Sequence, residues 1–351
     1  MDLRWNMALQ QQWWTRTNAA PLLGPYVPLE LPCGGLDFDV PPARMAERAL
    51  RNAEVLHAAP GDMLIVARVN FSVALLPALA GAGVQYDAHT SWSLPVASGV
   101  DDLRVQPFNP DHPLFQRYLE RLQPLLEHWS WDTYLPGLCD YLGPLDILAG
   151  MLGPENLAIE MMAHPAEVQR HAMDAACLVR DMLAYELRLH RAAGMTAGVT
   201  DGFCVWLPGT GIRMSEDFSA LVGEQHFRDF FIAPDSLVYE SVQSAFLHVH
   251  SAAHQCLPAI LDCRNLGAIE FGNDPNGPDL DTRIACGRLV QQRGLALQFG
   301  SWNIPLSVEE IERMVTGLDP RGLLIRLQTR SLQEAEELNC IVRELAARRG
   351  A

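Results

Sequence analysis

Two histidines and one glutamate carry the clearest chemical signal in the sequence. His248 and His250 stand at positions i and i+2 of a short apolar run, so both imidazoles point to one face of a strand. Glu270 ends the next apolar run, and neighbouring strands lie about 4.8 Å apart, so its carboxylate can reach the pair. Two imidazoles and a carboxylate with an open position are ligands typical of catalytic zinc or non-haem iron. The spacing predicts a metal site; the alternative is that the histidines form ordinary hydrogen bonds and Glu270 pairs with Arg283 or Arg264.

Two acidic residues and an arginine are further candidates. Asp201 directly follows an apolar run, where it either binds substrate or caps the loop over residues 202–211. Asp217 is expected to help orient a substrate. Arg213 can clamp a substrate carboxylate in a bidentate manner, and the alternative is a surface ion pair. The acidic loop over residues 274–281 lacks the ligand pattern of a calcium loop, so we expect a turn-rich connection.

Helices and short apolar strands alternate along the chain. Helices are predicted over residues 43–57, 165–193, 224–242 and 281–293, and Ser307 with Glu310 forms a capping box for another. Apolar runs follow them at residues 63–67, 196–200, 245–250, 268–271, 296–299 and 323–326. Such alternation indicates a parallel sheet. At least six units without a dinucleotide-binding fingerprint favour a (β/α)8 TIM barrel over an open sheet, and barrel enzymes place reactive groups at the carboxyl ends of strands.

The first 42 residues differ from the rest in composition. They hold three of the eight tryptophans and a run of prolines and glycines from Pro21 to Pro42, with little hydrophobic period. We therefore predict an irregular N-terminal arm over residues 1–42 that packs its aromatic side chains on a catalytic barrel over residues 43–351.

Composition excludes several classes of function. The chain of 351 residues has a formal net charge of −16, which disfavours binding to nucleic acids and anionic membrane surfaces. Its 26 basic residues are all arginine, so no lysine Schiff base can form. The eight cysteines form no C-x-x-C pair, no signal peptide is evident, and no apolar run approaches the roughly 18 residues of a membrane span. We expect a cytoplasmic protein with reduced cysteines.

Several segments resemble the uroporphyrinogen decarboxylase superfamily. They are the run from Ser215 to Phe230 before the histidine strand, the segments Asp146 to Gly153 and His164 to Val168, and Thr90 to Pro95 nearer the start. The resemblance extends from about residue 40 onward and implies a (β/α)8 barrel. This superfamily includes porphyrinogen decarboxylases and zinc-dependent corrinoid methyltransferases.

The resemblance implies a metal site with an altered ligand set. In the methyltransferases an H-x-C motif and a further cysteine hold zinc; here His248 matches the histidine, His250 replaces the cysteine, and Glu270 follows 22 residues after His248. No cysteine follows the strand at residues 296–299, where Trp302 stands, so the expected site is harder and less thiophilic. Trp302 and Trp92 are candidate substrate contacts beside Arg213.

The expected function is methyl transfer involving a small molecule. The resemblance implies zinc, with iron as the alternative, and a corrinoid, carried by a corrinoid protein, as candidate methyl carrier. The arginine-rich R-Q-A-G-R-Y segment of porphyrinogen decarboxylases is missing. Two alternatives stay open: a decarboxylase or lyase acting on a small carboxylated substrate, with His248 as general acid, and a small-molecule binding barrel without catalysis. A homodimer is a further candidate assembly.

Overall fold

A seven-stranded parallel sheet forms the centre of the molecule. The computed structural model describes residues 2–26, 36–59, 61–300 and 304–350. The strand order is β1-β13-β12-β11-β10-β9-β6, and every neighbouring pair is parallel. The strands are β1 (Leu22–Tyr26), β6 (Tyr141–Leu142), β9 (Gly211–Ser215), β10 (Ser244–Val249), β11 (Leu266–Phe271), β12 (Ala296–Gly300) and β13 (Leu323–Gln328).

Three smaller strand pairs complete the β-structure. β2 (Val66–Ala67) pairs with β5 (Leu135–Pro136) in parallel, whereas β3 (Gly83–Tyr86) with β4 (Ser91–Leu94) and β7 (Gly198–Thr200) with β8 (Trp206–Pro208) are antiparallel. A parallel bridge between Gly137 and Thr200 links the β2–β5 pair to the β7–β8 pair. This arrangement is consistent with a (β/α)8 barrel.

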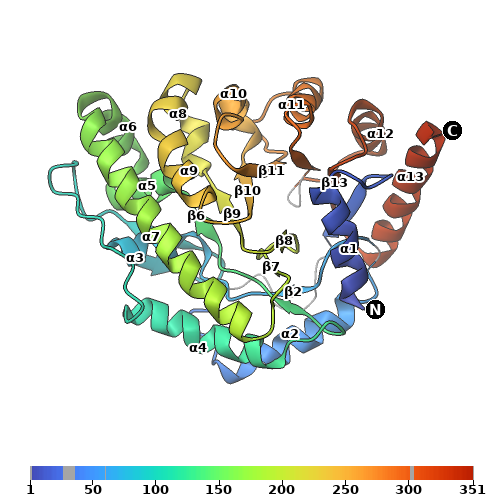
Figure 1. Cartoon of the computed structure of the whole chain (residues 1–351), viewed down its shortest axis with the longest axis horizontal. Helices are drawn as coiled ribbons and strands as arrows, with labels where there is room; N and C mark the ends of the chain where they lie inside the picture. Colours follow the sequence, from blue (N-terminus) through green and yellow to red (C-terminus); the bar gives the residue numbers. More distant parts are fainter. Residues whose placement is uncertain (1, 27–35, 60, 301–303, 351) are drawn as a thin grey trace.

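Helices surround the strands, as Figure 1 shows. The α-helices are α1 (Leu3–Trp14), α2 (Ala43–Leu56), α3 (Leu75–Ala80), α4 (Pro113–His128), α5 (Pro144–Leu152), α6 (Pro154–Ala163), α7 (Pro165–Ala192), α8 (Glu224–Phe230), α9 (Ile232–Tyr239), α10 (Leu257–Ile260), α11 (Leu280–Gln292), α12 (Val308–Gly317) and α13 (Leu332–Gly350). Three 3₁₀ turns are η1 (Ser72–Ala74), η2 (Asp217–Leu221) and η3 (Ser251–Cys256). None of the described helices is long and apolar enough to cross a membrane. The seven cysteines in the described ranges are free thiols.

The N-terminal arm was predicted to be irregular, which is wrong for the described residues of α1 and β1; the predicted packing of its aromatic side chains on the rest of the fold is confirmed for Trp13. Asp2 caps helix α1, and the buried Trp13 indole donates a hydrogen bond to the Leu297 carbonyl at 3.2 Å. β1 then pairs with β13, so the two ends of the chain meet in one sheet. Pro25 obscures this strand in the sequence because proline has no N–H to donate, and β1 tolerates it as a terminal strand of the sheet. The division of the chain at residue 42 stays a prediction.

Other predicted elements match the structure or differ from it in informative ways. Helices α7 and α11 and the capping box of α12 lie where they were predicted. The run at residues 196–200 was predicted as a member of the parallel sheet; β7 forms an antiparallel hairpin with β8, and its parallel pairing is the bridge between Thr200 and Gly137. The predicted helix over residues 224–242 is divided at Phe231 into α8 and α9.

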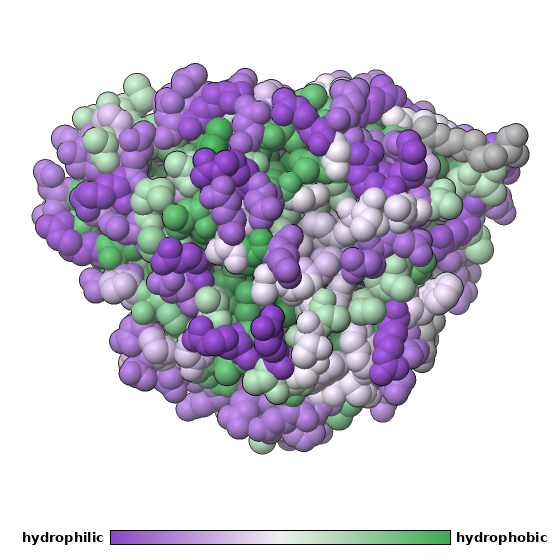
Figure 2. Space-filling model, in the orientation of Figure 1, coloured by the Kyte–Doolittle hydropathy of each residue, from purple (hydrophilic) through white to green (hydrophobic). Residues whose placement is uncertain are grey.

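The register of three neighbouring strands positions the candidate site. His248 on β10 lies opposite Ser215 on β9 and opposite Glu270 on β11. Because the three strands are parallel, their carboxyl ends and the loops that follow lie at one edge of the sheet. Figure 2 shows one face of the molecule, on which polar side chains predominate at the periphery and apolar ones gather between polar ones toward the middle.

Candidate functional site

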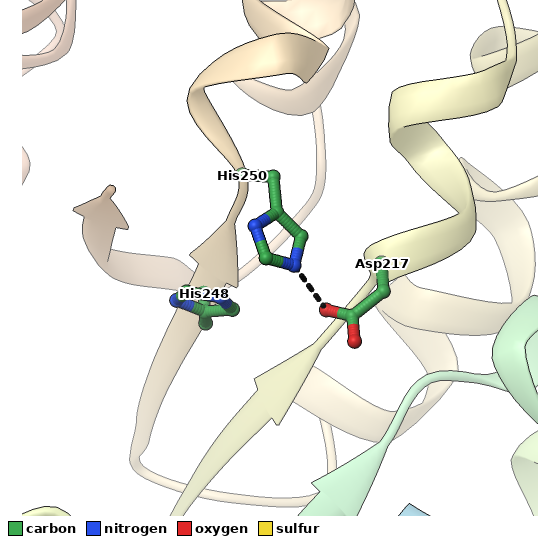
Figure 3. A group of neighbouring side chains, drawn as sticks. All are labelled: Asp217, His248 and His250. Carbon is green, nitrogen blue, oxygen red and sulfur yellow. Dashed lines mark ion pairs between the residues drawn. The ribbon is translucent and has the colours of Figure 1, made fainter. Parts of the chain in front are cut away.

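Asp217, His248 and His250 form a compact group at the carboxyl ends of β9 and β10. Each offers one ligand atom, and these atoms all lie within 4.8 Å of one another. Figure 3 shows the Asp217 carboxylate, which follows β9, pointing to the ring of His250, which follows β10. The two imidazole centroids are 5.1 Å apart, as expected for side chains at i and i+2. The group includes both predicted histidines but takes its carboxylate from a different strand than predicted.

His250 lies between two carboxylates. Its Nδ1 is 2.8 Å from Asp274 Oδ1, and its Nε2 is 3.4 Å from Asp217 Oδ1. Hydrogen bonds to Asp217 and Asp274 raise the pKa of His250 to about 10. Without a metal, the ring is therefore an imidazolium at neutral pH.

His248 and Glu270 contact each other deeper in the sheet. His248 Nδ1 lies 3.3 Å from Glu270 Oε2, and the same oxygen accepts hydrogen bonds from Arg213 Nε at 2.9 Å and Nη2 at 2.6 Å. Burial by itself would raise the pKa of Glu270, but Arg213 and His248 outweigh it and lower that pKa. Glu270 was predicted to pair with Arg283 or Arg264 if it bound no metal; it pairs with Arg213, and Arg264 pairs with Glu240.

Arg213 is the centre of a buried ion-pair network. Its side chain is only 3% exposed, so the surface ion pair considered from the sequence is not formed. Besides Glu270, the guanidinium lies 3.7 Å from both Asp140 and Asp201 and stacks over the Phe203 ring at 3.9 Å. The role of Arg213 as a substrate clamp stays a prediction, and its carboxylate partners are already present within the protein.

Asp201 has the loop-capping contacts that the sequence left as one of two options. Its Oδ1 accepts backbone N–H groups from Phe203 at 2.9 Å and Val205 at 2.8 Å. Burial raises the pKa of Asp201 to about 6, with Arg213 opposing the shift. Of the two tryptophans predicted to contact substrate, Trp92 is exposed on β4, and Trp302 lies outside the described residues.

Two supporting acidic residues were not identified from the sequence as part of the site. Asp146 on α5 accepts the N–H of Asp217 at 2.8 Å and of Phe218 at 2.7 Å, and so fixes the start of η2. Asp274 holds His250 from the loop after β11. Asp146 occurs in a segment quoted for the family resemblance, and Asp274 in the acidic turn; in both cases the signal was an acidic residue near a strand or helix end.

A second acidic pair lies directly behind the site. Glu216 and Asp235 are fully buried, and none of their four carboxylate oxygens has a hydrogen-bond partner when both are treated as ionised. Burial raises the pKa of Asp235 to about 7 and the pKa of Glu216 well above its usual value, where Asp235 adds to the effect. We interpret the pair as sharing a proton, which provides the missing hydrogen bond.

Asp217, His248 and His250 could together hold a metal ion, and one of their ligand-atom pairs already has the spacing of zinc ligands. Tetrahedral zinc has bonds of roughly 2.0–2.2 Å, which places neighbouring ligand atoms about 3.3–3.6 Å apart. The 3.4 Å between His250 Nε2 and Asp217 Oδ1 falls in that range and is long for a hydrogen bond between charged groups. The side chains of Asp217 and His250 are 44% and 37% exposed, so the group borders the solvent.

Solved structures share the fold of this chain. No protein-family model matches the chain, and no curated protein sequence matches it. A methyltransferase from Methanosarcina mazei superimposes with a TM-score of 0.66 at 13% sequence identity, covering 95% of this chain and 97% of that chain. At this identity the likeness shows a shared fold, and it extends over nearly the whole length of both proteins.

Proposed function

We propose that the protein is a metal-dependent methyltransferase that acts on a small molecule. The observation that carries the proposal is the group of Asp217, His248 and His250 at the carboxyl ends of adjacent parallel strands. The shared fold with a methyltransferase and the superfamily resemblance of the sequence support the same reaction class. We propose zinc as the metal, with iron as the alternative.

The ligand set follows from the contacts. Asp217, His248 and His250 would hold the ion and leave a further position open to substrate. Glu270, the carboxylate predicted from the sequence, would instead hold His248 in place, because Arg213 already donates two hydrogen bonds to its Oε2. When bound, the metal supplies a Lewis acid that lowers the pKa of a thiol or water.

The protein's own residues would prepare the acceptor for transfer. Asp146 holds the turn that carries Asp217, so this carboxylate stays at the site entrance. An acceptor thiol would release its proton to solvent water and form a bond from its sulfur to the methyl group, while the bond between the methyl group and its donor would break with the electron pair left on the donor. A corrinoid bound to a partner protein is the candidate methyl carrier, in line with the superfamily resemblance.

Metal analysis of the purified protein tests the proposal. We expect about one zinc or iron per chain, and we expect His248→Ala and His250→Ala to lose most of it. His128→Ala is a matched control, because His128 is an exposed histidine at the end of α4. Metal content well below one per chain after growth with added zinc contradicts the proposal. Turnover of a small carboxylated substrate that survives chelation but is lost in His248→Ala would select the lyase alternative.

A further inference from the structure

The loop after β11 packs closely against the end of β10. Asp274 Oδ1 binds His250 Nδ1 at 2.8 Å, while Asp274 Oδ2 accepts the backbone N–H of Ser251 at 2.5 Å and its hydroxyl at 2.8 Å. In return, the backbone N–H of Asp274 donates to Ser251 Oγ at 3.0 Å. Four hydrogen bonds thus connect one aspartate to two consecutive residues of the site.

The acidic turn over residues 274–281 brings Asp274 and Gly277 close to Ser251. Gly277 closes the turn by donating its N–H to the Asp274 carbonyl at 3.0 Å. A Cβ at position 277 would lie 2.1 Å from Ser251 Oγ and 2.9 Å from Ser251 Cβ, so only glycine allows the approach. The contact with Ser251 therefore requires glycine at position 277. The turn itself lacks the ligands of a calcium loop.

We propose that Asp274 is a positioning residue that fixes the orientation and tautomer of His250 for metal binding. With Nδ1–H donated to Asp274, the ring directs Nε2 to Asp217, where the ion would be held. Histidine ligands of metals usually donate their second N–H to a carboxylate or carbonyl in this way, and loss of that partner costs roughly 10–100-fold in metal affinity. This inference rests on the proposed metal site and adds a residue that does not touch the ion.

The geometry distinguishes this role from that of a simple surface ion pair. A surface pair would leave the aspartate free to adopt several rotamers, whereas both oxygens of Asp274 are engaged by groups of fixed position. Ser251 is fully buried and Asp274 is largely buried, so the contact is held within the fold. Two carboxylates also flank the ring, one for each nitrogen, which fits an imidazole held between a supporting group and a cation.

Zinc affinity of Asp274→Asn tests the proposal. His250 Nδ1 and Ser251 N–H contact different oxygens of Asp274, and asparagine replaces one of these oxygens by an NH2 donor. We therefore expect zinc to bind roughly 10–100-fold more weakly in competition with a chelator. Asp279→Asn is the matched control. Asp279 lies in the same loop and caps α11 by accepting the Thr282 N–H, and asparagine caps a helix equally well. The control should bind zinc as the wild type does.

A spectroscopic readout separates positioning from folding. Absorption of the cobalt-substituted protein reports ligand geometry, and we expect an altered spectrum for Asp274→Asn at cobalt saturation with unchanged circular dichroism. If Asp274→Asn fails to fold, Ser251→Ala removes only the hydroxyl contacts and should weaken zinc binding several-fold. Wild-type protein that binds no zinc overturns the metal site itself. Wild-type protein that binds zinc no more tightly than folded Asp274→Asn, or than Ser251→Ala where Asp274→Asn does not fold, overturns only the role of Asp274.

Discussion

The buried network around Arg213 makes a strong prediction about stability. Replacing Arg213 with methionine keeps an unbranched side chain over the Phe203 ring but removes the cation that faces Glu270, Asp201 and Asp140. Breaking a buried ion pair by removing one partner costs about 3–5 kcal/mol because the other charge stays buried without compensation. For 351 residues the unfolding entropy is about 0.7 kcal/mol per kelvin, so the loss corresponds to a Tm about 4–7 °C lower.

The pH dependence of this loss follows from the sign of the Glu270 shift. In the wild type the pKa of Glu270 is lowered, so its contribution to stability is complete above its unfolded pKa and is lost only in acid. Without Arg213, burial raises that pKa instead, and the folded protein loses stability as the pH rises above the unfolded value. We therefore expect a larger deficit in Arg213→Met at pH 8 than at pH 5.

Thermal melts followed by circular dichroism measure the effect. The matched control is Arg264→Met, which breaks an arginine–glutamate pair with Glu240 at 2.5 Å between side chains that are 66% and 46% exposed. Exposed pairs contribute about 0–1 kcal/mol, so its Tm should fall by no more than about 1.5 °C. The reasoning is refuted if Arg213→Met melts within 1 °C of the wild type at pH 8, or if the control loses as much.

Two further predictions concern buried carboxyl groups. Because burial raises the pKa of Asp235 to about 7, the folded state retains a proton that the unfolded chain releases near pH 4, and wild-type stability should fall as the pH rises between these values. Urea midpoints at pH 5 and pH 8 should show a smaller fall for Asp235→Asn, and an equal fall in both proteins contradicts the shared proton. Glu186 is fully buried and accepts hydrogen bonds from the hydroxyls of Tyr118 and Tyr141 and from the Cys139 N–H. Glu186→Gln places an amide N–H2 group against these donors and should lower the free energy of unfolding by about 1–3 kcal/mol, measured by thermal melts. An unchanged Tm would show that the carboxylate is not needed for stability.

The parts of the fold that the sequence predicts are those whose signal is local. β10, β11 and β12 are continuous apolar runs of the kind that parallel sheets bury on both faces, and the structure has them within two residues of their predicted bounds. The capping box of α12 depends only on Ser307 and Glu310, which are three residues apart. No distant part of the chain is needed to recognise these elements.

β9 shows why other buried strands cannot be recognised from the local sequence alone. Arg213 stands in the middle of this strand, and a charged residue there argues against burial when only the local sequence is considered. The strand is buried because Glu270 on β11, Asp201 after β7 and Asp140 before β6 compensate the guanidinium. Those partners are up to 73 residues away from Arg213 in the sequence, so no local pattern predicts these ion pairs.

The same reasoning explains why the carboxylate grouped with His248 and His250 comes from Asp217 and not from Glu270. Glu270 is level with His248, and His250 lies two residues further along, which is about 6.6 Å in a parallel strand. A carboxylate that contacts both histidines is therefore expected from a position beside His250, two residues beyond the level of His248 and Glu270. On the β11 side the residue beside His250 is Gly272, directly after β11, which has no side chain and whose N–H donates to the Val249 carbonyl.

On the other flank of β10, the strand register supplies the missing group. Ser215 is level with His248, so Asp217, two residues on, is level with His250. Asp146 then holds the backbone there and keeps the carboxylate beside the imidazole. Sequence spacing predicted that the two histidines lie together because they are two residues apart at the end of one strand. Whether the carboxylate comes from the β9 side or the β11 side depends on which neighbouring segment has a side chain beside His250, and that follows from the strand register.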